Sequence, residues 1–285
     1  MDTKEIKQRF NSVGKLYHYT TFDSAIKILQ SGTLLFGRLK DMNDINELYR
    51  PMVPNFNPDL PRENFERLYN NLKKEIGRYQ QISLTVDDFQ KGFNIPAMWG
   101  HYADKGNGVC LVFDKNKFIK SLGNGQKRHI LFDGVSYTDE FSSTVFCQAK
   151  TDGSIVTLND EEEKEYFFRK TKDWRYEQEF RVLVKTDSES REKLDFQDSL
   201  LAIVMHNAKS VALDQTVFDS IEFKIIEKII SSYNPVVPVL EHCVFIKETM
   251  LKTEEHTIWS SNPQNYDGYT HKAIEMADRE LSINR

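Results

Sequence analysis

Three groups of residues carry side chains whose types and spacing could do chemistry. The first is a histidine between two tyrosines, in Tyr17-His18-Tyr19-Thr20, which is predicted to form a strand. Successive side chains of a strand point to opposite faces, so His18 is expected to face away from both tyrosines. His18 could be a hydrogen-bonded core histidine, an edge residue, or a group that binds a ligand hydroxyl.

The second group combines two small hydroxyl side chains with an aromatic pair. Ser83 and Thr85 share one face of a predicted strand at residues 81–86. Trp99 and Tyr102 lie three residues apart and share one face of a predicted short helix. Together they could form a slot for a flat heteroaromatic ring, and equally the two aromatic rings could pack the core.

The third group is a row of charges formed by Glu177, Glu179 and Arg181. If the segment is a strand, all three side chains lie on one face. Burying such a row is costly unless its charges are paired. One interpretation is an exposed edge strand with compensating charges. The functional interpretation is a carboxylate held where positive charge develops in a reaction, with Arg181 fixing its partner glutamate.

Composition and charge exclude several classes of protein. An aromatic content of 12% is too high for a disordered acidic chain. The longest aliphatic run, residues 200–205, is far shorter than the roughly 20 residues of a membrane-spanning helix, and the first residues lack the apolar core of a signal peptide. A net charge of −5 disfavours general DNA binding, because neutralising phosphates supplies most non-specific affinity. We therefore expect a cytoplasmic protein that has no membrane partner and no strong nucleic-acid signature.

Several familiar motifs are missing from the sequence. It has no phosphate-binding loop, no dinucleotide-binding glycine motif, no zinc-protease motif and no hydrolase nucleophile motif. The three cysteines are widely spaced and the seven histidines are scattered, so we expect buried thiols in a reducing cytoplasm and no metal site.

Short predicted strands and helices follow one another without regular βαβ alternation. This pattern favours an α+β fold with mixed or antiparallel sheets and flanking helices. The predicted helices are residues 2–11, 62–79, 96–102, 160–171 and 216–230, and one more that starts at residue 22, where Thr20 or Thr21 can cap it, and stops at Gly32. The predicted strands are residues 16–20, 33–36, 81–86, 109–113, 128–137, 143–147, 180–185, 200–205 and 243–247.

Motifs from these groups occur in a characteristic order along residues 15–185. Leu16 to Thr20, Ile28 to Leu34 and Asn43-Asp44 come first, Met98 to Tyr102 and Gly108 to Asp114 follow, and Trp174, Glu177, Glu179 and Arg181 close the series. This order resembles a large bacterial family called domain of unknown function 2971. One departure is Ile45-Asn46-Glu47, where the family often has proline after Asn-Asp, and it affects only the local turn.

The family is in turn similar to the ADP-ribosyltransferase fold. In that superfamily a histidine or arginine on a first strand precedes a central serine or tyrosine motif, and a catalytic glutamate lies near a late strand. His18, then Ser83 with Thr85 or Tyr102, then Glu177 or Glu179 fall in that order. The resemblance implies an ADP-ribosyltransferase-like core at residues 1–195 and a C-terminal extension at 196–285 packed on the same domain.

The resemblance also implies an activity on NAD, either ADP-ribosyl transfer to an unknown macromolecular acceptor or NAD hydrolysis, in a toxin or an anti-phage defence effector. Glu179 would stabilise the oxocarbenium-like transition state, with Glu177 as the alternative or as the base for the acceptor. His18 is expected to be catalytic as well, and with Tyr19 to bind a ribose. The other expected binding residues are Trp99 or Tyr102 for the nicotinamide ring, Arg38 and Lys40 for the pyrophosphate, and Ser83, Thr85 and Arg181 around them.

Two alternatives remain open at this point. One is a non-catalytic module of the same fold that binds a nucleotide or a partner. The other is a metal-dependent nucleic-acid-processing enzyme that uses Glu177 and Glu179 as metal ligands, which is the weaker alternative because no third carboxylate is nearby in the sequence.

Overall fold

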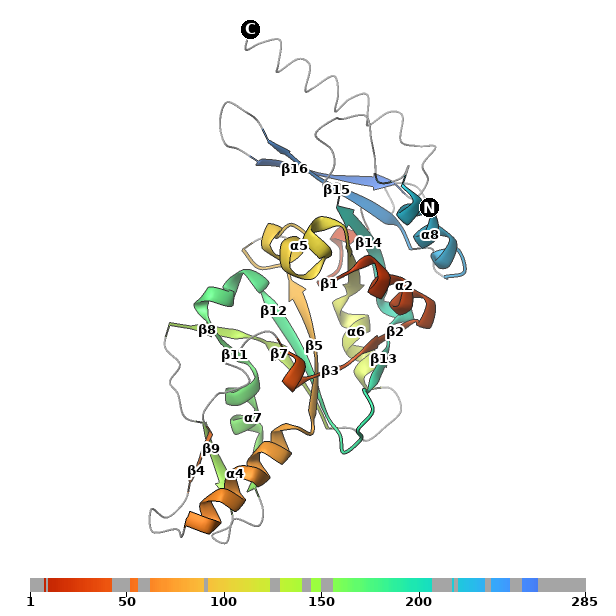
Figure 1. Ribbon diagram of the computed structural model, residues 1–285. Coiled ribbons are helices and arrows are strands. Elements are labelled where there is room, and N and C mark those ends of the chain that lie inside the picture. Colours follow the sequence, from red (N-terminus) through yellow and green to blue (C-terminus); the bar gives the residue numbers. More distant parts are fainter. Residues whose placement is uncertain are drawn as a thin grey trace. The chain divides into compact units, whose positions relative to one another are not determined.

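A computed structural model of the chain describes the parts that Figure 1 draws as ribbon. The described residues are 8, 10–42, 52–55, 62–89, 92–123, 129–139, 145–149, 156–206, 217, 220–233, 237–246 and 253–260. Asn43-Asp44 and most of the predicted helix at residues 2–11 lie outside this part of the chain.

The chain folds into two compact units that alternate along the sequence. Unit 1 comprises Met1–Thr33, Val86–Ser121 and Asp195–Arg285, and unit 2 comprises Leu34–Thr85 and Leu122–Leu194. The sequence predicts a boundary after residue 195. In the structure, Leu194 is the last residue of unit 2, and Asp195 begins the last segment of unit 1. Residues 15–185, which carry the sequence motifs, are divided between both units.

The sheet of unit 1 has the strand order β16-β15-β14-β6-β1. The strands are β1 (Lys15–Thr20), β6 (Val109–Asp114), β14 (Leu200–His206), β15 (Val239–Ile246) and β16 (Thr253–Ser260). β14 and β15 run parallel and the other neighbours run antiparallel. The two apolar runs predicted as core strands, at β6 and β14, are buried along almost their whole length.

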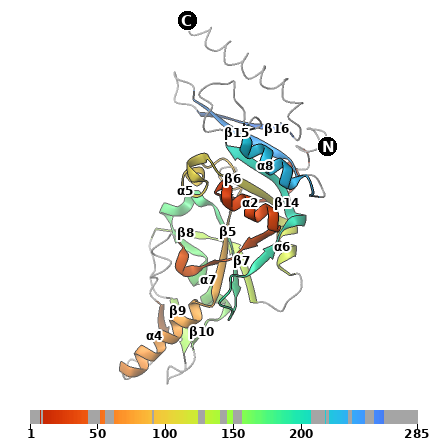
Figure 2. The same cartoon turned by 45° about the vertical axis from the view of Figure 1, so that its right-hand side comes forward.

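The helices of unit 1 are α2 (Phe22–Ser31), α5 (Pro96–Tyr102), α6 (Lys115–Leu122) and α8 (Ile221–Ile230), with short 3-10 turns η2 (Asp104–Gly106) and η4 (Gln197–Ser199). Helices α2 and α8 lie side by side (Figure 2). Thr21 caps α2 by accepting a hydrogen bond from the Ser24 N–H, and Gly32 ends it in the left-handed conformation. Both signals are readable in the sequence, and the helix begins and ends where they place it.

Unit 2 is built on the antiparallel strands β3 (Gly37–Arg38), β5 (Tyr79–Val86), β12 (Glu179–Lys185) and β7 (His129–Gly134), in that order. β12 is a central strand, because it pairs with β5 on one side and with β7 on the other. The interpretation of residues 177–181 as an exposed edge strand is therefore wrong.

Helices α4 (Arg62–Ile76) and α7 (Asp160–Phe167) supply much of the core of unit 2. Leu68 and Leu72 from α4 join Phe167 from α7 in a buried cluster with Tyr79 and Leu183 from the sheet. The remaining elements are η1 (Leu39–Asp41), η3 (Lys172–Glu177) and three small sheets. These sheets are formed by β10 (Val156–Thr157), β9 (Val145–Ala149) and β4 (Met52–Asn55), by β11 (Arg169–Thr171) and β8 (Ser136–Thr138), and by β13 (Lys193–Asp195) and β2 (Thr33–Leu35).

Three predicted helices differ from the observed ones at an end. The helix predicted at residues 62–79 stops at Ile76, because the chain turns there and Tyr79 begins β5. The helix predicted at residues 160–171 stops at Phe167, because Phe168 leaves the helical conformation and residues 169–171 pair with β8 instead. The helix predicted from residue 216 starts at Ile221, where the Ser220 side chain accepts a hydrogen bond from the Phe223 N–H and fixes the start.

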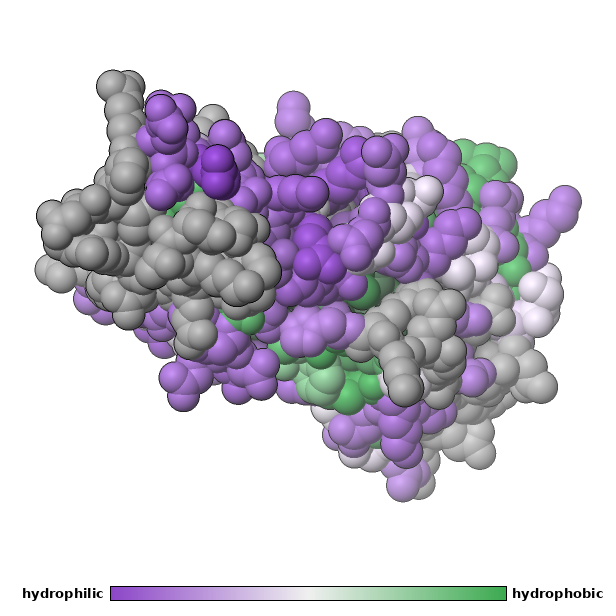
Figure 3. Space-filling view, turned by 90° about the horizontal axis from the view of Figure 1, so that it is seen from below, coloured by the Kyte–Doolittle hydropathy of each residue, from purple (hydrophilic) through white to green (hydrophobic). Residues whose placement is uncertain are grey.

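The structure confirms a mixed α+β architecture with mostly antiparallel sheets and flanking helices. None of the helices in the described residues is long and apolar enough to cross a membrane. The face shown in Figure 3 is mainly hydrophilic where it is described, with small apolar areas between the polar side chains.

Candidate functional site

Four of the predicted site residues come together on one face of the sheet in unit 2. The register of β12 against β5 places Glu179 opposite Thr85 and Arg181 opposite Ser83. Directly opposed residues of an antiparallel pair point to the same face, so the hydroxyl pair and the charged pair are neighbours. The sequence placed these residues in two separate groups, and the strand pairing joins them.

The charged pair is held by a two-pronged ion pair. The Arg181 Nε donates to Glu179 Oε1 at 2.9 Å, and the Arg181 Nη2 donates to Glu179 Oε2 at 2.8 Å. The Arg181 Nη1 donates to the backbone carbonyl of Phe167, which ties the strand to the end of α7. The prediction that Arg181 fixes a partner glutamate is confirmed.

Lys170, which the sequence did not single out, completes the network. Its Nζ lies 2.7 Å from Glu177 Oε2 and 3.0 Å from Glu179 Oε2. Lys170 is on β11, within the segment that was expected to be helical, so the sequence offered no signal for it. Two carboxylates and two cations thus form a network whose formal charges cancel.

Glu177 does not lie on the strand with the other two charges. It ends the 3-10 turn η3, and Gln178 between the two glutamates adopts a left-handed backbone with φ of 46°. The prediction of one strand face for Glu177, Glu179 and Arg181 is therefore wrong for Glu177. The kink at Gln178 nevertheless brings both carboxylates to the same lysine ammonium.

The network is buried and Glu179 is ionised within it. Lys170, Glu177, Glu179 and Arg181 are only 2–4% exposed. Burial opposes the charge on Glu179, but Arg181, Lys170 and the Ser83 hydroxyl outweigh it and lower the pKa of Glu179 to about 2. Because the Lys170 ammonium bridges Glu177 and Glu179, this arrangement disfavours the interpretation of the two glutamates as metal ligands.

Two aromatic side chains, Tyr137 and Trp174, contact the network. The Glu179 N–H donates to the Tyr137 hydroxyl at 2.8 Å, and Lys170 Nζ lies 5.1 Å from the centroid of the Trp174 ring. Burial raises the pKa of Tyr137, so its hydroxyl is neutral at physiological pH. Trp174, the first residue of the motif that ends at Arg181, therefore contacts the network through Lys170.

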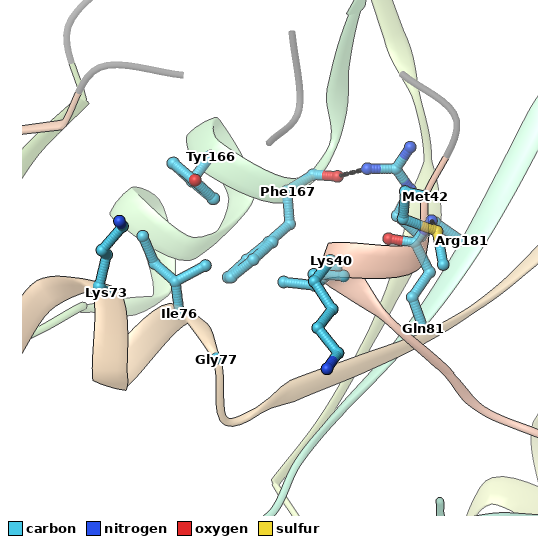
Figure 4. A pocket seen from close by; sticks show the side chains of 10 residues that line it. Lys40, Met42, Lys73, Ile76, Gly77, Gln81, Tyr166, Phe167 and Arg181 are labelled. Carbon is cyan, nitrogen blue, oxygen red and sulfur yellow. Dashed lines mark hydrogen bonds between the residues drawn. The ribbon is translucent and has the colours of Figure 1, made fainter. Parts of the chain in front are cut away.

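Arg181 belongs to the buried network and also lines a pocket in unit 2 (Figure 4). The pocket has a volume of about 210 Å³. Its wall contains three basic side chains (Lys40, Lys73 and Arg181), two aromatic ones (Tyr166 and Phe167), and the residues Leu39, Met42, Ile76, Gly77 and Gln81. Lys40 and Arg181 are both among the residues that the sequence assigned to binding.

Gln81 places an unsatisfied polar atom in the wall of this pocket. Its Nε2 donates to the Ser83 hydroxyl at 2.8 Å, while its buried Oε1 has no hydrogen-bond partner among the described residues. In Figure 4 this oxygen points toward the side of the pocket where Lys40 and Phe167 lie. If the amide were turned over, its nitrogen would be unpaired instead, so either orientation leaves one polar atom for a ligand.

The second predicted phosphate contact has a different role in the structure. Arg38 donates to the backbone carbonyl of Glu189 and is not among the residues that line the pocket. Thr85 is fully buried opposite Glu179, whereas Ser83 is exposed and bonds to both Gln81 and Glu179.

The other predicted site residues belong to unit 1. His18 is half-buried on β1 and faces away from Tyr17 and Tyr19, as the strand alternation predicts. Tyr19 donates its hydroxyl hydrogen to the Gly92 carbonyl at 2.6 Å, and Tyr102 is half-buried on α5. The roles assigned to these three residues and to Glu177 and Glu179 in catalysis and binding stay predictions.

Trp99 is buried in the core of unit 1. Its indole N–H donates to the Phe93 carbonyl at 2.8 Å, and its ring contacts Tyr19, His206 and His242. These contacts correspond to the core-packing alternative for Trp99. The two histidines were not singled out in the sequence, because 36 residues separate them and only the pairing of β14 with β15 makes them neighbours.

A comparison with known protein families matches part of the chain. Residues 98–182 match the family model described as protein of unknown function, DUF2971. The DUF2971 resemblance is confirmed over this segment. The DUF2971 segment starts on α5 and ends on β12, so it contains every charged residue of the buried network. A search of curated proteins and a search of solved structures each found no match.

Proposed function

We propose that unit 2 binds a small anionic ligand that carries a flat ring, of the nucleotide class, with NAD among the candidates. The observation that supports this proposal is the composition of the pocket wall. Lys40 and Lys73 contribute positive charge, Tyr166 and Phe167 contribute aromatic rings, and none of the ten lining residues is acidic. The charge of Arg181, the third basic residue in the wall, is balanced by Glu179. Basic side chains next to aromatic rings suit a phosphate joined to a heterocycle.

The size and charge of the pocket limit which part of the ligand enters it. Its volume of about 210 Å³ is smaller than the roughly 300–1,000 Å³ of sites that enclose a drug-sized molecule. A single ring fits, and a whole dinucleotide does not. Arg181 is already paired with Glu179, whereas Lys40 and Lys73 are exposed. We therefore expect the ring to lie inside near Gln81 and the phosphates to lie outside near the two lysines.

Calorimetric titration of the full chain with NAD, AMP and inorganic pyrophosphate tests this proposal. NAD and AMP are expected to bind more tightly than pyrophosphate, which has no ring. Lys40→Ala and Lys73→Ala should each weaken binding about fivefold, the equivalent of about 1 kcal/mol for one exposed charge pair. Lys74→Ala is the matched control, because Lys74 follows Lys73 on α4 and does not line the pocket. Equal affinities for all three variants would contradict the proposal.

Cleavage of NAD by an ADP-ribosyltransferase-like fold is the second candidate function. It is favoured by Glu179, which is ionised and holds Arg181 in the wall of the pocket. In this reaction the bond between nicotinamide and ribose breaks, its electrons leave with nicotinamide, and water or an acceptor macromolecule attacks the ribose carbon. Both Glu179 oxygens are engaged by Arg181, so the residue would act on the substrate through Arg181 as long as the pair stays closed.

Nicotinamide release from NAD separates this enzyme from the non-catalytic nucleotide-binding module. The enzyme requires release by the wild-type protein and a loss of release in a Glu179→Gln protein that circular dichroism shows to be folded and that still binds NAD. A protein that binds NAD in the calorimeter and releases no nicotinamide, with or without a cell extract as a source of acceptors, is the binding module. Activity equal in wild type and Glu179→Gln would remove Glu179 from the mechanism.

A further inference from the structure

Two histidines in unit 1 face each other across neighbouring parallel strands. His206 ends β14, and the register places it opposite His242 on β15. The two Nδ1 atoms are 3.2 Å apart, and His206 Nδ1 is also 3.1 Å from the His242 carbonyl oxygen. His242 is fully buried, while His206 is half-buried. The pair therefore has one closed side and one partly open side.

Hydrogen-bond accounting fixes how the protons are distributed in this pair. The His242 Nε2 lies 2.9 Å from the Asn94 side-chain oxygen. With the Asn94 amide in this orientation its oxygen accepts, so Nε2 carries the hydrogen. The Nδ1 of neutral His242 then has a free lone pair directed at His206. The His242 carbonyl oxygen, 3.1 Å from His206 Nδ1, also can only accept, so His206 Nδ1 carries a hydrogen when no ion is bound. A metal ion could take the place of this hydrogen between the two Nδ1 atoms.

The same geometry matches a pair of metal ligands. Two imidazole nitrogens 3.2 Å apart, each about 2.0–2.1 Å from a Zn²⁺ ion, subtend an angle of about 100° at the metal, between octahedral and tetrahedral values. A metal-binding histidine usually donates its other ring N–H to an oxygen that fixes its orientation, and Asn94 does this for His242.

The surroundings of the pair are aromatic. The ring of Trp99 lies 5.1 Å from that of His206 and 6.0 Å from that of His242, and Phe93 lies 5.6 Å from His242. No group of three or more His, Cys, Asp or Glu side chains is arranged for a metal within the described part of the chain. The pair offers two nitrogen ligands, and water must supply the others from the open side at His206.

We propose that His206 and His242 form a two-histidine site for a borderline transition-metal ion such as Zn²⁺ or Cu²⁺, with Asn94 orienting His242. The ion takes the position between the two Nδ1 atoms, and His206 carries its proton on Nε2 when the ion is bound. Imidazole ligands suit Zn²⁺ and Cu²⁺ and leave out Ca²⁺ and Mg²⁺, which require oxygen ligands. This proposal concerns unit 1 and is independent of the nucleotide pocket in unit 2.

Trp99 provides the readout, because Cu²⁺ quenches the fluorescence of an adjacent indole. Cu²⁺ titration of the full chain at pH 7.5 is expected to quench fluorescence with a stoichiometry of one, and Zn²⁺ should reverse the quenching by competition. His206→Gln removes one ligand at a half-buried position and should lower the Cu²⁺ affinity at least tenfold. His101→Gln is the matched control, since His101 is exposed on the same helix as Trp99 and is not part of the pair.

A second variant, Asn94→Asp, is expected to raise the metal affinity, which a loss of folding would not do. Asn94→Asp replaces the amide that accepts from His242 with a carboxylate, which should raise the affinity severalfold, because a stronger acceptor makes the imidazole more basic. If His206→Gln binds Cu²⁺ as tightly as His101→Gln, or if Zn²⁺ does not compete, the proposal is overturned and the two rings share only a hydrogen bond. Circular dichroism of each variant verifies that it is folded.

Discussion

Arg181 binds both carboxylate oxygens of Glu179, which lies only two residues before it on the same face of β12. A strand side chain normally meets residues of neighbouring strands, so a two-pronged pair along one strand is a local solution that needs no partner from the rest of the sheet. Lys170 then balances the second glutamate, and the network becomes neutral as a whole. A row of buried charges is stable here because each charge has a partner.

Breaking this pair should destabilise the protein strongly. Glu179→Gln leaves Arg181 buried next to an uncharged amide, and the loss of one partner of a buried ion pair costs about 3–5 kcal/mol. The double variant Glu179→Gln with Arg181→Met should recover part of that loss, because no unpaired charge remains. Urea unfolding measures both free energies. A loss below about 1 kcal/mol in Glu179→Gln is incompatible with the buried network.

The stability of the protein should also depend on pH through Glu179. Its pKa is about 2 in the folded protein and about 4.3 in an unfolded chain. A lowered folded pKa means that the unfolded state binds the proton first, so the stabilisation is complete above about pH 4.3 and disappears as the pH falls through 2. Unfolding free energies measured between pH 5 and pH 2 should fall by about 3 kcal/mol more for the wild type than for the double variant.

Much of the fold and part of the candidate site could be predicted from the sequence, for identifiable reasons. Local signals were sufficient for α2, where Thr21 and Gly32 define both ends, and for the apolar strands β6 and β14. They were also sufficient for the link between Arg181 and Glu179, because the two residues are close in sequence.

The remaining site residues depend on contacts between distant segments. The register of β12 with β5 brings Ser83 to Arg181, and no spacing in the sequence encodes it. The sequence does not indicate Lys170, because the charged segment at residues 160–171 is predicted to be a helix, whereas residues 169–171 pair with β8 as a strand. Gln81 could have been noticed only as a polar residue in a strand that is otherwise mostly buried.

Two glycines of unit 1 should respond in opposite ways to the same substitution. A Cβ atom added at Gly92 would lie 2.1 Å from a carbon of the Tyr17 ring, which Asp87 holds in place through the tyrosine hydroxyl. Gly92→Ala should therefore lower the free energy of unfolding by about 1–3 kcal/mol. Gly100→Ala meets no atom within 4 Å and lies in α5, so it should stabilise by up to about 1 kcal/mol. Thermal unfolding of both variants measures the difference, and equal melting temperatures would show that Tyr17 does not pack on Gly92.

We expect the Gln81 side chain to lower the stability of the free protein and to strengthen the binding of a ligand. Its unpaired Oε1 is a cost in the free protein, because a buried polar atom without a partner destabilises by about 1–3 kcal/mol. Gln81→Leu has a similar volume and removes that atom together with the hydrogen bond to the exposed Ser83 hydroxyl. The variant is expected to unfold at the same or a higher urea concentration than the wild type, while its affinity for AMP falls about tenfold or more. Gln80→Leu is the matched control, since the Gln80 side chain bonds to the Ser190 carbonyl and the Glu192 N–H and should lose stability on substitution. A Gln81→Leu protein that is less stable than the wild type and binds AMP equally well would assign the residue to the core and not to the pocket.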